Sequence, residues 1–146
     1  MLVFKTSLKL KKFLDSKNLS VGLVPTMGAL HKGHLSLVEK AFKENDYVVI
    51  SIYINPTQFN KISDFKNYPQ NQKKDKSLLK PFKKKIIVYT PNDKEIYPNG
   101  IKSNSYNFGS LDKHMEGKFR DNHFNGVATV VEALFKIITP NKAYFG

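Results

Sequence analysis

Two histidines, His31 and His34, stand three residues apart in the stretch VPTMGALHKGH at 24–34. On a helix this spacing puts the two side chains about one turn apart, so both rings can face the same ligand. Gly28 and Gly33 suit a close approach of the backbone to a phosphate. Imidazole side chains at the N-terminus of this helix can donate hydrogen bonds to phosphate oxygens and stabilise the charge that develops on a leaving pyrophosphate. A turn with two solvent-exposed histidines is the alternative, but strand, glycines and spacing together favour an anion site.

The same stretch lacks the signatures of two other common sites. It matches neither the GxxxxGK(S/T) phosphate loop nor the HExxH zinc motif. The aspartates are scattered along the chain, and their spacing specifies no metal site. We therefore predict no metal ligands among the protein side chains.

A second polar stretch, INPTQF at 54–59, follows an apolar run. Asn55 and Gln58 are neutral amides able to fix a hydroxyl or a carboxylate, and Pro56 holds the loop. A capping asparagine and an exposed glutamine are the alternative. The position of the stretch at the same sheet edge as the histidine turn favours a binding role.

A third stretch, MEGKFRDNHFNGVATVV at 115–131, contains a histidine, His123, and the only arginine of the chain, Arg120. Arg120 pairs either with a substrate anion or with Asp121 or Glu116. The sequence leaves these alternatives, and the role of His123, open.

The elements that must position these residues alternate along the chain. The run YVVISIYIN at 47–55 has apolar residues at both odd and even positions, which is typical of a parallel strand covered on both faces. The patterns predict helices at 7–16, 33–45, 72–80 and 124–138, a helical turn at 111–116, and strands at 20–25, 47–55, 85–90, 104–108 and from 143. The fold class is therefore α/β, with a Rossmann-like, mainly parallel sheet and helices on both faces. Ligands in such folds bind beyond the carboxyl ends of the strands.

The last predicted helix is strongly apolar on one side. Its apolar residues are Val127, Val130, Val131, Leu134 and Phe135. We expect this side to be buried against the sheet.

Composition narrows the class of protein. With 146 residues, 40% hydrophobic and no cysteine, the chain fits one domain without disulfides or thiol chemistry. It has no apolar run of about 18 residues and no signal peptide, so we expect a cytoplasmic protein without membrane contact. The net charge of +12 invites a nucleic-acid interpretation, but 23 of the 24 basic residues are lysines. Direct base contacts favour arginine, so we expect no nucleic-acid partner; a non-catalytic, lysine-rich RNA-binding protein is the alternative.

Taken together, these stretches resemble the pantothenate synthetase (pantoate-β-alanine ligase) family, which shares the HIGH motif with class I aminoacyl-tRNA synthetases. VPTMGALHKGHLSLV, VVISIYINPTQF, DFKNYP, the EIYP loop, MEGKFRDNHFNGVATVV and ITPNKAYFG occur in family order. PTMGALHxGH followed by NPxQF is the specific part, because HxGH alone indicates only the superfamily. Another HIGH-type nucleotidyltransferase with a different acceptor is the nearest alternative, and NPTQF argues against it.

The resemblance implies an ATP-dependent ligation in two steps, with Mg²⁺ accompanying the nucleotide. Pantoate attacks the α-phosphorus of ATP to give pantoyl adenylate and pyrophosphate, and the amine of β-alanine then displaces AMP to give pantothenate. By position, His34 is the proton donor and His31 its partner. The implied ATP-binding residues are Met27, Gly28, Ala29, Leu30, His31, Lys32, Gly33, His34 and Gly146. The implied pantoate and β-alanine pocket comprises Gln58, Asn55, Met27, Tyr68, Val130 and Val131, although core packing is the alternative for the two valines.

The chain departs from the family pattern in several places, among them RDNHF at 120–124 where the family has RPGHF. Gln70 stands where the family has arginine, and Gln72, Lys73 and Lys74 precede Asp75 where the family has an acidic cluster. Gly146 matches the first residue of the family's GEKD segment. We therefore expect residues 1–146 to form a nucleotidyltransferase domain that is incomplete at its C-terminus, without the family's small C-terminal domain and with weak or no activity alone. The family also leads us to expect a homodimer.

Overall fold

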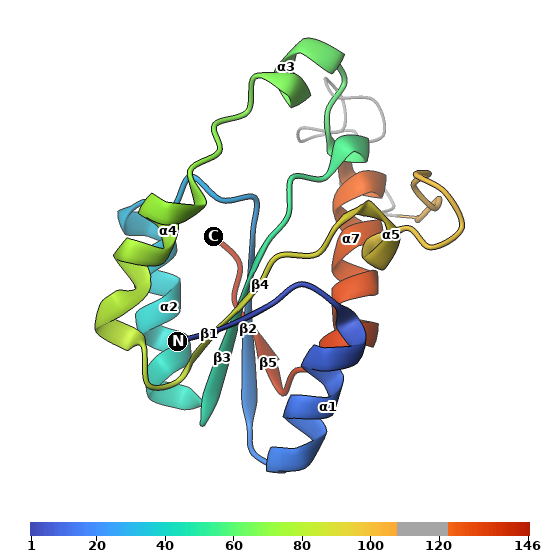
Figure 1. Cartoon of the computed structure of the whole chain (residues 1–146). Coiled ribbons are helices and arrows are strands. Elements are labelled where there is room, and N and C mark those ends of the chain that lie inside the picture. Colours follow the sequence, from blue (N-terminus) through green and yellow to red (C-terminus); the bar gives the residue numbers. More distant parts are fainter. Residues whose placement is uncertain (108–122) are drawn as a thin grey trace.

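A parallel sheet forms the centre of the molecule (Figure 1). The computed structural model describes residues 1–107 and 123–146. Within these ranges the strands are β1 (Leu2–Phe4), β2 (Val21–Thr26), β3 (Tyr47–Ile52), β4 (Ile86–Tyr89) and β5 (Lys142–Ala143). Their order across the sheet is β1-β4-β3-β2-β5, and every neighbouring pair is parallel. The predicted α/β class with a mainly parallel sheet is confirmed.

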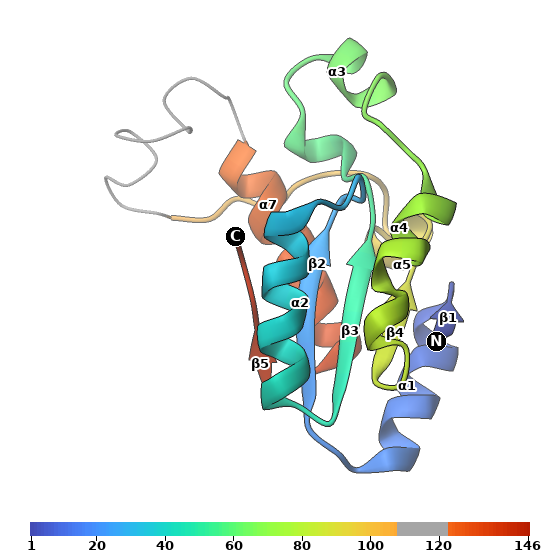
Figure 2. The same ribbon diagram turned by 90° about the vertical axis from the view of Figure 1, so that its left-hand side faces the viewer.

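Helices cover both faces of this sheet (Figures 1 and 2). The helices α1 (Ser7–Lys17) and α7 (His123–Ile138) lie on one face, and α2 (Lys32–Glu44) and α4 (Gln72–Leu79) lie on the other. Successive strand residues point to opposite faces, so Val49 packs with the first pair of helices and Ile50 with the second. The shorter elements are η1 (Pro56–Gln58), α3 (Ile62–Lys66), η2 (Lys80–Phe82) and α5 (Asp93–Ile96).

Most predicted elements are confirmed to within a few residues, but one strand ends early. The strand predicted at 47–55 stops at Ile52. The N–H of Tyr53 still donates to the Thr26 carbonyl at 3.1 Å. Beyond that bond β2 turns away at Gly28, whose φ is +83°, so β3 loses its partner and continues into η1.

The strand predicted at 104–108 is wrong for 104–107, which form no strand. The N–H of Asn104 donates to Thr129 Oγ1 at 2.9 Å and the N–H of Tyr106 donates to Asn125 Oδ1 at 3.1 Å. Side chains of α7 therefore take the place of a neighbouring strand. Phe108, the turn predicted at 111–116 and Arg120 lie outside the described residues.

Two further predictions need correction. Phe135 is exposed, because the buried side of α7 runs instead through His123, Gly126, Thr129, Val130, Leu134 and Ile138. The strand at Leu2–Phe4 was not predicted; it is three residues long and merges in the sequence with the amphipathic pattern of α1. The strand predicted at 20–25 is consequently the second of the chain, not the first.

In the described ranges, no helix is long and apolar enough to cross a membrane.

The first turn of α7 packs directly on η1. A Cβ atom added at Gly126 would lie 2.5 Å from the Thr57 carbonyl oxygen and 2.8 Å from Thr57 Oγ1. The carbonyl of Gly126 also accepts a hydrogen bond from Asn55 Nδ2 at 2.9 Å. The absence of a side chain at Gly126 is therefore what lets the two backbones meet.

We predict that Gly126→Ala destabilises the chain by about 1–3 kcal/mol through overpacking, less the gain of up to about 1 kcal/mol in helix propensity. Urea denaturation measures the change. Lys136→Ala on the exposed side of α7 is the control, expected within about 0.5 kcal/mol of the parent. A Gly126→Ala chain as stable as this control would contradict the close contact.

Candidate active site

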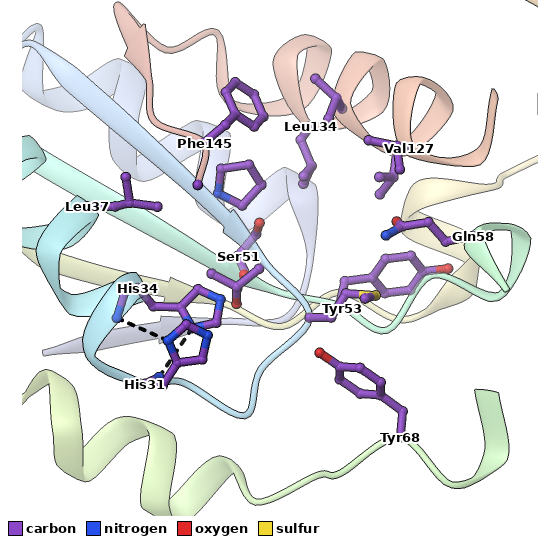
Figure 3. A pocket seen from close by; sticks show the side chains of 17 residues that line it. His31, His34, Leu37, Ser51, Tyr53, Gln58, Tyr68, Val127, Leu134 and Phe145 are labelled. Carbon is purple, nitrogen blue, oxygen red and sulfur yellow. Dashed lines mark hydrogen bonds between the residues drawn. The ribbon is translucent and has the colours of Figure 1, made fainter. Parts of the chain in front are cut away.

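A cavity of about 460 Å³ opens at the carboxyl ends of β2, β3 and β5 (Figure 3). The connection that leaves β2 runs to the face of α2, whereas β5 is reached from α7 on the opposite face. The crevice between β2 and β5 is thus the switch point at which parallel α/β sheets bind ligands. Its volume suits a small molecule.

The loop between β2 and α2 is held by a buried carboxylate from α4. Asp75 is 2% exposed. Its two oxygens accept the N–H of Ala29 at 3.2 Å and the N–H of Leu30 at 2.9 Å. Ala29 has φ +52° and Gly28 has φ +83°, so the loop passes twice through left-handed backbone, which costs energy at the non-glycine position. The Asp75 bonds offset this cost and fix where α2 begins.

The two histidines cap the N-terminus of α2 (Figure 3). Nδ1 of His31 accepts the N–H of Gly33 at 3.0 Å, and Nδ1 of His34 accepts the N–H of His31 at 3.2 Å. A neutral imidazole that accepts at Nδ1 carries its proton on Nε2. Both rings, 4.1 Å apart at their centroids, therefore present Nε2–H donors beside the positive end of the helix dipole.

The environment of His34 keeps its ring neutral. Burial lowers the pKa of His34 below its ordinary value of 6.5, the neighbouring His31 lowers it further, and the Asp75 carboxylate acts in the opposite direction. The ring is therefore a neutral hydrogen-bond donor at pH 7, and protonation of Nδ1 would break its bond with the His31 N–H.

Gln58 is held by two groups. Asn55 is fully buried, and its Nδ2 donates to the Gly126 carbonyl at 2.9 Å and to Gln58 Oε1 at 3.1 Å. A carbonyl can only accept, so this pair of bonds fixes the orientation of the Asn55 amide. Oδ1 of Asn55 in turn accepts from Thr57 and from the Tyr97 hydroxyl. With its oxygen engaged, Gln58 offers the Nε2 donors of its amide to the pocket that it lines.

His123 secures the backbone of the same residue. Its Nδ1 lies 3.1 Å from the Gln58 carbonyl oxygen, and since this oxygen only accepts, Nδ1 carries the proton. The side chain is 9% exposed. The structure thus gives a positioning contact to a histidine whose role the sequence left open.

One wall of the cavity is apolar. Val127, Val130, Val131 and Leu134 of α7 line it, and Tyr53 and Tyr68 face them. Val130 and Leu134 belong also to the buried core, and Val131 packs against it. The two interpretations of Val130 and Val131 are therefore compatible, because the same side chains serve as core and as pocket wall.

The structure brings most of the predicted site residues together. Met27, His31, Gly33, His34, Gln58, Tyr68, Val130, Val131 and Gly146 line the cavity. Gly28 lines a smaller neighbouring cavity of about 220 Å³, together with Met27 and Asp75. Ala29, Leu30 and the exposed Lys32 do not line the larger cavity, and Asn55 lies behind Gln58. Direct ligand contacts stay predictions for all of these residues.

Sequence reasoning missed several residues of the site. Asp75 looked like one scattered acid, because its partners lie 45 and 46 residues away. Tyr97, Ser51 and Thr26 gave no local signal either. Thr26 Oγ1 donates to the Ser51 carbonyl at 2.8 Å and accepts the N–H of Gly28 at 3.1 Å.

Comparisons with known proteins agree with the geometry. A family model described as pantoate-beta-alanine ligase matches residues 2–146. A pantothenate synthetase of Christiangramia forsetii is 52% identical over 133 residues, which make up 91% of this chain and 47% of that protein. The crystal structure of pantothenate synthetase from Thermus thermophilus has a TM-score of 0.89 and 41% identity, covering 100% of this chain and 52% of that one.

A further solved structure carries ligands. It is the pantoate-beta-alanine ligase from Francisella tularensis complexed with beta-gamma ATP and β-alanine, with a TM-score of 0.89 and 37% identity over 98% of this chain and 55% of that one. The chain spans about half the length of the relatives that it matches.

We predict that Asp75→Asn destabilises the chain by about 1–3 kcal/mol, because the new NH₂ group meets one of the two backbone N–H donors and leaves it unpaired. Chemical denaturation measures the loss, and faster hydrogen exchange at Ala29 and Leu30 localises it. Asp64→Asn, at an exposed position of α3, serves as the matched control. Equal stability of the two variants would count against the role of Asp75.

We predict that the His34 ring titrates below pH 6.5 in the folded chain. The unfolded chain then binds this proton more readily, so the stability contributed by neutral His34 is present above that pH and is lost as pH falls through the folded pKa. NMR titration of the ring signals gives the midpoint. His31→Ala is expected to raise it, because a neighbour that lowers the pKa is removed; an unchanged or lower midpoint would contradict this assignment.

Proposed function

The chain belongs to the pantoate-β-alanine ligase family, and from this premise we propose that its cavity binds pantoate and ATP for the adenylation step of pantothenate synthesis. The observation that carries the proposal is the pair of neutral Nε2–H donors on the N-terminus of α2, which line the same cavity as the apolar wall of α7. One end of the cavity is thus built for phosphate oxygens and the other for a branched, oxygen-bearing acid.

On the nucleotide side, the donors act on charge that forms in the reaction. A carboxylate oxygen of pantoate attacks the α-phosphorus of ATP, the bond to the bridging oxygen breaks, and pyrophosphate leaves with the electron pair. His34 and His31 donate from Nε2 to phosphate oxygens as this charge develops, and because the backbone bonds already orient both rings, little reorganisation is needed. Both rings are donors without being charged.

On the acid side, the pocket supplies apolar contacts and one oriented amide. The methyl groups of pantoate would pack on Val130 and Val131, and the Nε2 of Gln58 would donate to a hydroxyl or carboxylate oxygen. In the second step the β-alanine amine attacks the acyl carbon, loses a proton and displaces AMP. The apolar lining favours this outcome because it keeps water from the hydrolysable acyl adenylate.

We propose that Mg²⁺ enters as part of the nucleotide complex. Among residues 1–107 and 123–146, no three His, Cys, Asp or Glu side chains come together in a group that could hold a metal ion. The acid nearest to the loop, Asp75, uses both oxygens for backbone N–H groups. The described side chains thus do not fit a protein-held Mg²⁺ site, and phosphates and waters would supply the ligands.

A homodimer stays a prediction. Its candidate surface is the outer edge of β1, where Leu2 and Val3 are 45% and 41% exposed. Apolar side chains on an edge strand favour pairing with another chain.

The test is pantoate-dependent release of pyrophosphate from ATP by the chain and two variants. We expect His34→Ala to lower the rate about 100-fold to 1,000-fold, because a donor to the developing charge is lost, and Lys40→Ala, exposed on the same helix, to leave it unchanged. A panel of other small acids tests the choice of substrate. Because the chain alone is expected to have weak or no activity, binding of ATP and of pantoate to the parent chain is measured alongside by calorimetry. A parent chain that binds neither ligand, or a release rate that His34→Ala does not lower, would overturn the proposal.

A further inference from the structure

One buried hydroxyl of the cavity is without a hydrogen-bond partner. Ser51 on β3 is 1% exposed, lines the cavity, and its Oγ makes no hydrogen bond to any residue that the structure describes. Leaving a buried hydroxyl unpaired costs about 1–3 kcal/mol. Such a group is therefore either an energetic defect of the fold or a group that is paired when the cavity is filled.

The other buried hydroxyls of the cavity are already engaged. Thr26 Oγ1 donates to the Ser51 carbonyl at 2.8 Å and accepts from Gly28. The Tyr53 hydroxyl donates to Asp93 Oδ1 at 2.8 Å. Among these three residues, only Ser51 has a hydroxyl that is not engaged in a hydrogen bond. The missing partner is therefore specific to Ser51 and is not a general property of the polar residues at this sheet edge.

The surroundings of Ser51 indicate what it would meet. It lies on the same sheet face as Val49 and Tyr53, under α7, and Figure 3 places it between the histidine pair and the side chains of Leu134 and Val127 in that view. A ligand that reaches Ser51 must carry an oxygen or nitrogen on an otherwise apolar body. A branched hydroxy acid has this chemistry, whereas a phosphate would be placed among aliphatic side chains.

We propose that Ser51 is a further substrate-binding residue, whose hydroxyl forms a hydrogen bond with an oxygen of the hydroxy acid held against α7. This proposal rests on the proposed function, because it assigns the acid as pantoate. Ser51 would thus add a second polar contact to that of Gln58. Two polar contacts at different positions fix the orientation of the bound acid, whereas one contact would only help to bind it.

The test compares Ser51→Ala with Tyr89→Phe. Tyr89 pairs with Ser51 across β3 and β4, and its hydroxyl is likewise buried without a partner among the described residues, but it does not line the cavity. Neither substitution removes a hydrogen bond from the free chain, so both variants should melt at or above the temperature of the parent. Isothermal titration with pantoate, in the presence of ATP, then measures the dissociation constant of each chain.

We expect Ser51→Ala to raise the pantoate dissociation constant about 5-fold to 30-fold, the effect of one lost hydrogen bond, and Tyr89→Phe to leave it unchanged. If Ser51→Ala binds pantoate as tightly as the parent chain, the inference about Ser51 is overturned and the proposed function is not affected. A lower melting temperature of ligand-free Ser51→Ala would also overturn it, because the hydroxyl would then serve the fold. A parent chain that binds no pantoate would overturn the proposed function, and this inference with it.

A second experiment changes the ligand in order to identify which oxygen of the acid contacts Ser51. The acid 2-hydroxy-3,3-dimethylbutanoate lacks the 4-hydroxyl of pantoate. If that hydroxyl is the partner, Ser51→Ala weakens pantoate but not this analogue; if the partner is the carboxylate or the 2-hydroxyl, both acids are weakened alike. A loss seen with the analogue and not with pantoate would contradict the proposed contact.

Discussion

The buried carboxylate of Asp75 accepts hydrogen bonds from two consecutive N–H groups of the β2–α2 loop, and the rest of the site depends on this anchor. The loop must pass through left-handed backbone at Gly28 and Ala29 before α2 can start at the edge of the sheet. Charge-assisted bonds to the N–H groups of this loop are stronger than neutral ones. The start of α2, and with it the histidine cap, is therefore set by a residue of α4.

The Gln58 end of the cavity is anchored to a different layer. Gln58 is held by Asn55 and His123, and both contacts tie η1 to the first turn of α7. The histidine end of the cavity thus belongs to the face of α2 and α4, whereas the Gln58 end belongs to the face of α1 and α7. At the carboxyl edge of the sheet, residues of both α2 and α7 line the same cavity, so the switch point is a place where donors from both layers can reach one ligand.

The sequence predicted those parts of this arrangement that depend on local spacing. The histidine pair follows from three residues of separation, and the NPTQF loop follows from a buried strand that precedes it. Contacts between distant segments gave no such signal: Asp75 acts on residues 45 and 46 positions away, and His123 acts on a residue 65 positions away. The wrong strand at 104–107 has the same origin, because side chains of α7 satisfy backbone groups that the local pattern assigned to a sheet.

The charged side chains that the structure describes lie outside the cavity, and the polar groups inside it are uncharged. The net charge is +12, yet among the described residues the cavity is lined by no lysine, arginine, aspartate or glutamate. A lysine-rich surface raises the local concentration of anions and is screened by salt. Inside the cavity the donors are neutral imidazoles, an amide and hydroxyls, whose hydrogen bonds strengthen when water is excluded. Under the proposed function, a neutral lining binds an anion less tightly than a lysine would before the reaction. Its oriented dipoles would instead respond to the charge that moves to the leaving group, so that the interaction is concentrated in the transition state.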